Sequence, residues 1–212
     1  MGQMQNQLQR ILSDHGDVTI GNVPYPRYAD VAASKYADEV MRVYRSLGGV
    51  LEQFPLNLRS WDLEFNGVAV ELDEYLHFNR YRRATLESAV YQELPRFPLE
   101  AYRRYCDDYE ERCLKAGSYG GKWSNPSCER QFGPAGAQKD LSGNGAARWR
   151  QRAFYDFVKD LSPLIIDVPV VRLSIWESIG PQGQQRTVGA NLEDPSASAI
   201  DTTLRLITTR AS

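Results

Sequence analysis

An Asn-Gly pair stands between two alternating apolar runs at residues 61–72, and this pattern constrains the fold more than any other part of the chain. Asn66 and Gly67 both tolerate the positive φ of a tight type I′ turn, so the pattern predicts a β-hairpin with these residues in its turn. Because side chains alternate between the two faces of a strand, one face of this hairpin is wholly apolar. The expected pairs on that face are Phe65 with Val68, Leu63 with Val70 and Trp61 with Leu72.

The opposite face of the predicted hairpin is acidic. Asp62 is expected directly across from Glu71, with Asp73 one diagonal step away. Like charges placed opposite each other destabilise a sheet, and carboxylate oxygens are the ligands that Mg²⁺ and Mn²⁺ prefer. We therefore expect these three acids to hold a divalent cation. The alternative is a solvated outer face on which the acids have no ligand.

His77 follows Asp73 by four residues, at the expected end of the second hairpin strand. Histidine titrates near neutral pH, so this side chain could accept or donate a proton beside the acids. The alternative is a hydrogen-bonded, partly buried histidine with a structural role.

Length and composition indicate an ordinary globular protein. The 212 residues allow one domain with insertions or flexible ends, and 42% are hydrophobic and 25% charged. The sequence contains no run of eighteen apolar residues, so it predicts no membrane span. Its N-terminal segment lacks the basic and apolar regions of a signal peptide. We expect a cytoplasmic protein with no membrane partner.

Charge is distributed unevenly along the chain, although the net charge is only −2. Residues 1–78 carry 6 basic and 11 acidic groups, whereas residues 79–152 carry 14 basic and 9 acidic groups. A basic stretch after acidic ligands is what a metal-dependent enzyme acting on phosphodiesters needs. Ordinary solvated helices can also produce such a difference.

Three cysteines, Cys106, Cys113 and Cys128, lie within the basic stretch. An odd number argues against a disulfide framework, and the spacings do not match ordinary zinc-binding pairs. Buried, reduced thiols are the preferred interpretation, and a structural Zn²⁺ with an acidic fourth ligand is the alternative.

Helical periodicity and turn residues predict the remaining elements. A strand that returns after a helical connection can lie parallel to a hairpin strand through a right-handed crossover, which gives an α/β fold with a mixed central sheet flanked by helices. We divide the chain into an N-terminal extension (1–27), a main domain (28–180, with a helical and Gly-rich insertion at about 97–145) and a C-terminal extension (181–212). The expected helices are 3–13, 28–47, 84–94, 99–116 and 148–161, the expected strands after the hairpin are 168–177 and 202–208, and 117–145 is an ordered loop.

This order resembles the restriction-endonuclease-like (PD-(D/E)XK) superfamily, and within it the branch around very-short-patch-repair endonucleases. Asp62 stands where that branch has the Asp of its first hairpin strand, and Glu71-Leu-Asp73-Glu-Tyr-Leu-His77 resembles its second motif. The later segment Val170–Glu177, with Arg172 and Trp176-Glu177, resembles its closing strand, and Gln151 with Tyr155 is similar to a Gln-x-x-x-Tyr helix of related nucleases. The sequence departs from the superfamily in lacking the Lys two residues after the Glu and in carrying Glu74 where Gly is common.

The resemblance implies a metal-dependent DNA endonuclease of repair, restriction or defence. It implies that Asp62 and Glu71 ligate Mg²⁺ or Mn²⁺ and that Asp73 completes the coordination shell of the cation. It also implies that His77 acts as general base or general acid. Glu39 is a further candidate ligand. It also implies that Arg80 and Arg82 neutralise phosphate charge, with Arg83 and Gln151 as further contacts to the nucleic acid. Arg83 could instead pair with Glu87 along one helix.

Two other functions stay open from the sequence. One is a nucleic-acid-binding protein that kept the fold and lost catalysis, which fits the absent Lys and the presence of Glu74. The other is a protein-interaction module built on the tyrosine-rich helix 99–116. The protein could also act as a homodimer or with a partner subunit.

Overall fold

The computed structural model describes residues 2–181 and 183–211. These residues form two compact units. Unit 1 combines three stretches, residues up to Tyr25, Arg59–Glu74 and the chain from Asp167 onward. Unit 2 consists of Pro26–Leu58 and Tyr75–Ile166. The two ends of the chain, which the sequence suggested as extensions, thus belong to the unit that contains the central sheet.

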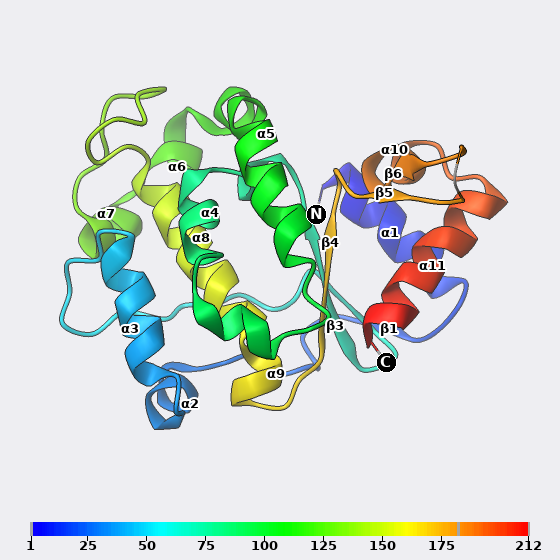
Figure 1. Cartoon of the computed structure of the whole chain (residues 1–212), viewed down its shortest axis with the longest axis horizontal. Coiled ribbons are helices and arrows are strands. Elements are labelled where there is room, and N and C mark those ends of the chain that lie inside the picture. Colours follow the sequence, from blue (N-terminus) through cyan, green and yellow to red (C-terminus); the bar gives the residue numbers. More distant parts are fainter. Residues whose placement is uncertain (1, 182, 212) are drawn as a thin grey trace. The chain divides into compact units, whose positions relative to one another are not determined.

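Unit 1 contains a mixed four-stranded sheet (Figure 1), which confirms the predicted α/β class. Its strands are β1 (Val18–Thr19), β2 (Leu63–Phe65), β3 (Val68–Asp73) and β4 (Val170–Ser174), in the order β1-β2-β3-β4. Strands β1, β2 and β3 are antiparallel neighbours, and β4 lies parallel to β3. This confirms the prediction that a later strand returns, after a long helical connection, to lie parallel to a hairpin strand. The short strand β1 was not predicted.

The hairpin of β2 and β3 forms at the predicted turn. Asn66 and Gly67 have φ angles of 49° and 80°, the left-handed backbone that a type I′ turn requires. Phe65 pairs with Val68 and Leu63 with Val70, as predicted. Trp61 lies outside the paired residues of β2 but is only 1% exposed, and its indole N–H donates to the carbonyl of Pro24. This register places Glu71 beside Arg172 in the neighbouring β4.

Three helices of unit 1 lie on one side of the sheet in Figure 1: α1 (Gln3–Ser13), α10 (Val188–Glu193) and α11 (Ala197–Ala211). The short pair β5 (Ser178–Ile179) and β6 (Arg186–Thr187) forms a separate two-stranded sheet. Helix α11 is fixed to β4 by Arg210, which donates to the Arg172 carbonyl and forms an ion pair with Glu177.

The predicted strand over 202–208 is wrong, because these residues lie within α11. Threonines suggested a strand, since β-branched residues fit pleated sheets. However, Ala199, Thr203 and Ile207 recur every four residues and are buried, which is the spacing of one helical face. The Thr203 hydroxyl donates to the carbonyl of Ala199, so its polar atom is satisfied within the helix.

Unit 2 is helical, and α8 (Ala147–Asp160) runs through it (Figure 1). The other elements of this unit are α2 (Tyr28–Ala33), α3 (Ala37–Ser46), η1 (Tyr75–His77), α4 (Arg80–Thr85), η2 (Ala89–Glu93), α5 (Leu99–Gly117), α6 (Gly120–Trp123), α7 (Pro126–Phe132) and α9 (Ser162–Ile165). Helices α3, α4, α6 and α7 all contact α8, and α5 packs on α4. The large apolar side chains of α8, Trp149, Phe154 and Phe157, are fully buried.

Local chemistry explains where unit 2 departs from the predicted elements. The expected helix 28–47 is interrupted after Ala33, because Ser34 adopts an extended backbone. The expected loop 117–145 contains two helices, and α7 begins where the Asn125 side chain accepts backbone N–H groups directly before Pro126. Helices 99–116 and 148–161 were predicted to within about a residue at each end. Among the described residues, no helix is long and apolar enough to cross a membrane.

Candidate metal and acid–base site

Arg172 holds two of the predicted hairpin acids within unit 1. Its guanidinium lies 2.7 Å from the carboxylate of Asp73 and 3.8 Å from that of Glu71. All three residues are at most 4% exposed. Parallel pairing of β3 and β4 places Arg172 beside Glu71, so this contact follows directly from the strand register. In the sequence, Arg172 was noted only because its segment resembles the closing strand of the very-short-patch-repair branch.

Asp62 and Glu71 extend the hairpin beyond its paired strands through their side chains. The Glu71 carboxylate accepts the backbone N–H of Asp62 at 3.2 Å, and the Asp62 carboxylate accepts the N–H of Leu72 at 3.0 Å. The amide of Gln5 on α1 donates to the Asp62 carbonyl at 2.9 Å. The hairpin therefore brings the acids of the two strands together through reciprocal backbone contacts.

Glu64 is a further acid of the hairpin that sequence reasoning did not single out. It is fully buried, and its carboxylate accepts the Thr19 hydroxyl and the N–H groups of Gly21 and Asn22 at 2.7–3.0 Å. Burial favours the neutral acid, but these donors outweigh it and hold the pKa of Glu64 below its ordinary value. Glu64 thus anchors the chain after β1, and its oxygens are committed to that role.

His77 and Asp156 form a hydrogen-bonded pair within unit 2. The Nδ1 atom of His77 lies 2.8 Å from a carboxylate oxygen of Asp156. The Asp156 side chain is 7% exposed, and that of His77 is 22% exposed. His77 ends η1, and Asp156 lies on α8, 79 residues further along the chain. An ionised carboxylate only accepts, so an ionised Asp156 pairs with the tautomer of His77 that carries its proton on Nδ1.

Sequence reasoning missed Asp156, although a signal was present. The residue interrupts the apolar run Phe154-Tyr155-Asp156-Phe157-Val158 on a helix whose neighbouring side chains are buried. A carboxylate is seldom fully buried without a partner. An acid in this setting therefore predicts a specific contact, but the pattern does not identify His77 as the partner.

The arginines predicted to contact phosphate have different surroundings. Arg82, which the resemblance suggested as a contact to phosphate, is 1% exposed and forms an ion pair with Asp160 within the core. Arg80 is exposed and pairs with Glu110 on α5, and these contacts hold the pKa of Glu110 below its ordinary value although burial acts in the opposite direction. Arg83 pairs with Glu87, the alternative weighed from the sequence, and with Asp107.

The two remaining candidates, Gln151 and Glu39, also form hydrogen bonds with neighbouring side chains. Gln151 is buried and accepts from Arg148, while Tyr155, one turn later, donates to the carbonyl of Pro55. Glu39 is bound by Arg42 and by the Ser88 hydroxyl, and the contact with Arg42 lowers the pKa of its carboxyl. These contacts serve the packing of unit 2.

The three cysteines are buried, free thiols, as preferred from the sequence. Burial raises the pKa values of Cys106 and Cys113 to about 12, which keeps both thiols protonated. Within the part of the chain that the structure describes, the cysteines belong to no cluster able to hold a metal. The predicted alternative of a structural Zn²⁺ through these residues therefore finds no support.

Each unit carries residues of the kinds that bind metal ions: Asp73 in unit 1, and His77 and Asp156 in unit 2. Carboxylate oxygens and imidazole nitrogens are both ligands of divalent cations. Asp73 ends β3, and three residues separate it from His77 in the chain. From the sequence, Asp73 was predicted as a metal ligand and His77 as an acid or base, whereas Asp156 was not singled out.

Residues 42–194 of the chain match the model of the protein family DUF7255, a family of unknown function. The chain belongs to this family. The match spans more than half of the sequence and includes β2, β3 and β4 as well as His77, Asp156 and Arg172. Searches of curated proteins and of solved structures found no match.

Proposed function

We propose that this member of DUF7255 is a metal-dependent nuclease that hydrolyses phosphodiester bonds in DNA. The observation that carries the proposal is the 2.8 Å contact between His77 Nδ1 and the nearly buried carboxylate of Asp156. Three acids of the hairpin, Asp62, Glu71 and Asp73, supply the oxygen ligands. The resemblance to the restriction-endonuclease-like superfamily supports the same reaction class.

His77 is the proton acceptor in this proposal. Asp156 accepts the Nδ1 proton, which fixes the tautomer and the orientation of the ring and stabilises the imidazolium that forms when Nε2 takes a proton. The proton comes from the water that attacks the phosphorus atom. Asp156 is a positioning residue in this step, because it acts through the imidazole.

The residues fit a divalent cation by their chemistry. The carboxylates of Asp62, Glu71 and Asp73, which all belong to unit 1, would hold it. When bound, such a cation polarises the phosphate and lowers the pKa of a coordinated water. Arg172 holds the Asp73 carboxylate at 2.7 Å and thereby fixes its orientation at the end of β3.

Cleavage of labelled single- and double-stranded DNA, with Mg²⁺, Mn²⁺ or EDTA, tests the proposal. We expect cleavage that requires the cation, and a loss of about 10²–10⁴-fold in His77→Gln, the range by which a positioned acid or base accelerates a reaction. His15→Gln is the matched control, because His15 is the only other histidine of the chain. Its Nδ1 contacts the carbonyl of Ile11 in α1, and its replacement should leave cleavage unchanged. Cation-dependent cleavage that His77→Gln retains would overturn the proposal.

Binding of Mn²⁺, measured by calorimetry without DNA, separates the two roles. Asp62→Asn and Glu71→Gln should weaken Mn²⁺ binding, since each removes a carboxylate charge. His77→Gln should bind Mn²⁺ within a few fold of the wild type while losing cleavage. If His77→Gln also loses Mn²⁺, the imidazole is a ligand and the proton acceptor lies elsewhere.

A nucleic-acid-binding protein without catalysis is the second candidate function. The ion pair between Arg172 and Asp73 favours it, because the guanidinium engages a carboxylate that a cation needs. This candidate predicts DNA binding that weakens with salt, no Mn²⁺ binding and no cleavage under any of the conditions above.

A further inference from the structure

The amino end of α8 lacks the groups that usually complete the start of a helix. Its N-cap residue, Ala146, makes no hydrogen bond through its side chain, and the first turn contains no acid. Arg148 and Arg150 lie in that turn instead. A helix carries partial positive charge at its amino end, so cations are unfavourable there and an anion is favourable. The residues at the start of this 14-residue helix therefore leave its dipole uncompensated.

Backbone donors at this end have no acceptor among residues 2–181 and 183–211. The N–H groups of Trp149 and Arg150 donate to the carbonyl of Ala146, whereas those of Ala146, Ala147 and Arg148 donate to no group of the described chain. Ala146 and Ala147 are at most 1% exposed, so bulk water has little access to them. Because a buried N–H without an acceptor costs free energy, such groups are nearly always paired. A partner is therefore expected here.

The hydroxyl of Tyr81 ends at the same place. Tyr81 lies on α4 and is 9% exposed, and its hydroxyl has no hydrogen-bond partner within the part of the chain that the structure describes. The hydroxyl lies against Gly145, the residue directly before the N-cap, so closely that a Cβ atom at this position would collide with it. The absent side chain of Gly145 thus leaves room for the hydroxyl at the amino end of α8.

Arg150 brings a further unpaired donor. Its guanidinium lies over the Tyr81 ring, 5.1 Å from the centroid, and its two terminal nitrogens donate to the carbonyls of Leu47 and Gly143. Its Nε atom is buried and has no acceptor in the described ranges. The backbone N–H groups, the hydroxyl and Nε can all donate, so the missing partner is an acceptor. The positive charge of the guanidinium favours an acceptor that is negatively charged.

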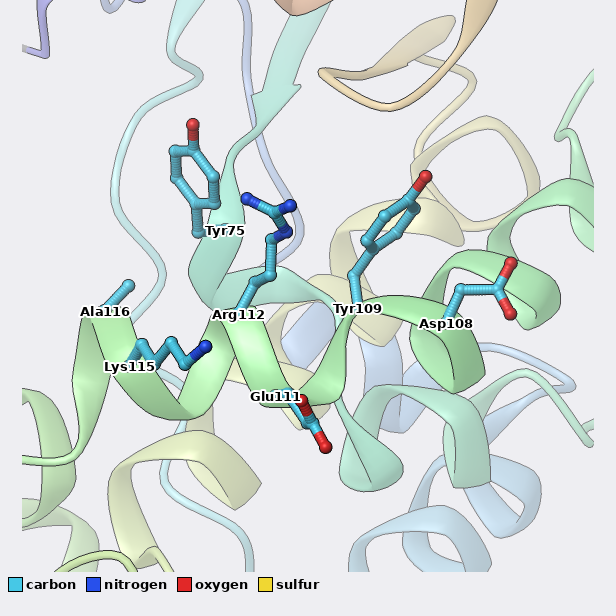
Figure 2. A pocket seen from close by; sticks show the side chains of 7 residues that line it. All are labelled: Tyr75, Asp108, Tyr109, Glu111, Arg112, Lys115 and Ala116. Carbon is cyan, nitrogen blue, oxygen red and sulfur yellow. The ribbon is translucent and has the colours of Figure 1, made fainter.

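The depression along α5 that Figure 2 shows differs in this respect. It has a volume of about 660 Å³ and is lined by residues that include Tyr75, Tyr109 and Arg112. These three residues interact with other groups of the protein. Donors at the amino end of α8, by contrast, remain available to a ligand.

We propose that a chloride ion binds at the amino end of α8, held by the N–H groups of Ala147 and Arg148 and by the Tyr81 hydroxyl. Helix amino ends bind anions through their free N–H groups and their dipole, and a monatomic anion accepts hydrogen bonds from several directions. A small ion is favoured over phosphate, because Ala147 is buried and Tyr81 packs directly against Gly145. The ion completes the start of the helix that carries Asp156, and the inference does not depend on the proposed nuclease reaction.

Urea denaturation of the full chain over a wide range of chloride concentrations tests the inference, with sodium gluconate keeping the ionic strength constant. An ion that binds only the folded protein lowers the unfolding equilibrium constant tenfold for each tenfold rise in its concentration above the dissociation constant. We expect this dependence in the wild type. In Tyr81→Phe the chloride concentration at which it begins should rise by at least about tenfold, the effect of losing one hydrogen bond to a charged group.

Tyr36→Phe is the matched control. Tyr36 also belongs to unit 2 and is 7% exposed, but its hydroxyl donates to the carboxylate of Glu93. This variant should change the stability and leave the chloride dependence as in the wild type. Equal chloride dependence in wild type and Tyr81→Phe would overturn the inference, and so would a wild type whose stability does not depend on chloride.

Ala146→Asp supplies the missing anion from the chain itself. A carboxylate at the N-cap accepts the N–H of the second helical residue, which is Arg148 here. The variant should be more stable than the wild type at low chloride and should lose the chloride dependence. Ala146→Ser makes the same hydrogen bond with a smaller side chain and should shift the dependence in the same direction, so the test remains if Ala146→Asp does not fold.

A crystal structure of the wild type grown in sodium bromide identifies the ion itself, since bromide scatters anomalously and water does not. An anomalous peak within hydrogen-bond distance of the Arg148 nitrogen and the Tyr81 hydroxyl would support the inference. A water without anomalous signal at this place, or bromide bound only elsewhere, would overturn it. Stabilisation by phosphate and not by chloride would overturn the assignment of the ion.

Discussion

Asp156 and Asp160 lie one turn apart on α8 and are both nearly buried, yet their partners differ in kind. Asp160 accepts from the Arg82 guanidinium at 2.7 Å and from the Tyr91 hydroxyl at 2.5 Å. Asp156 accepts from the imidazole of His77 at 2.8 Å. Arginine stays charged at every physiological pH, whereas histidine gains and loses its proton near neutrality.

In the function proposed above, this difference distinguishes a structural carboxylate from one that assists proton transfer. The Arg82–Asp160 pair keeps a fixed charge within the core, and the Asn79 cap at the start of α4 helps to hold Arg82 in place. The His77–Asp156 pair contains a side chain of the type that exchanges protons near neutral pH. The two acids are similarly buried, so the proposal separates them by the chemistry of their partners and not by burial.

The largest effect is expected from breaking the structural pair. Arg82→Met leaves the Asp160 carboxylate buried without its cation and should lower the free energy of unfolding by about 3–5 kcal/mol. Urea denaturation at pH 7 measures this loss. The double variant Arg82→Met/Asp160→Leu should recover part of it, because no buried charge is left.

Arg80→Met is the matched control for that prediction. Arg80 is two residues away and pairs with Glu110, but half of its side chain is exposed, so the expected loss is only about 0–1 kcal/mol. Equal losses in Arg80→Met and Arg82→Met would contradict the structural role assigned to Asp160.

An intermediate effect is expected from Glu64, the structural carboxylate of unit 1. Glu64→Gln replaces hydrogen bonds to a charged group and should cost about 1.5–3 kcal/mol at pH 7. The pKa of Glu64 is lowered in the folded protein, so its stabilisation is present above the ordinary carboxyl pKa and is lost as pH falls through the folded value. Urea titrations at several pH values should show the difference between wild type and Glu64→Gln shrinking in acid. A difference that grows in acid would contradict the lowered pKa.

The sequence predicted the features that depend on local pattern. The Asn66-Gly67 turn, the hairpin register and helices α5 and α8 all follow from neighbouring residues, and the apolar strand β4 pairs in parallel as expected. Hairpin turns and helical faces are encoded within a few residues, so periodicity is sufficient to find them.

The rest depends on contacts between residues far apart in the chain. Asp156 and His77 are 79 residues apart, and Arg82 and Asp160 are 78 apart, so no local pattern pairs them. The run of arginines at 80, 82 and 83 looked uniform in the sequence, yet one of its members is buried and the others are not. Helix α11 was missed because tertiary packing of Ala199, Thr203 and Ile207 overrides the strand preference of threonine.

The smallest effect is expected from the His77–Asp156 pair. His77→Gln and Asp156→Asn each remove the hydrogen bond between the two side chains, at a cost of about 1 kcal/mol. The comparison is then sharpened by adding Mn²⁺, since a cation that binds only the folded protein raises its stability by about 2.7 kcal/mol at 100 times its dissociation constant. Wild type, His77→Gln and Asp156→Asn should gain this stability in urea denaturation, and Asp62→Asn should not. A gain in Asp62→Asn would show that Asp62 is no ligand, and a loss of about 3–5 kcal/mol in Asp156→Asn without Mn²⁺ would place Asp156 in the same structural role as Asp160.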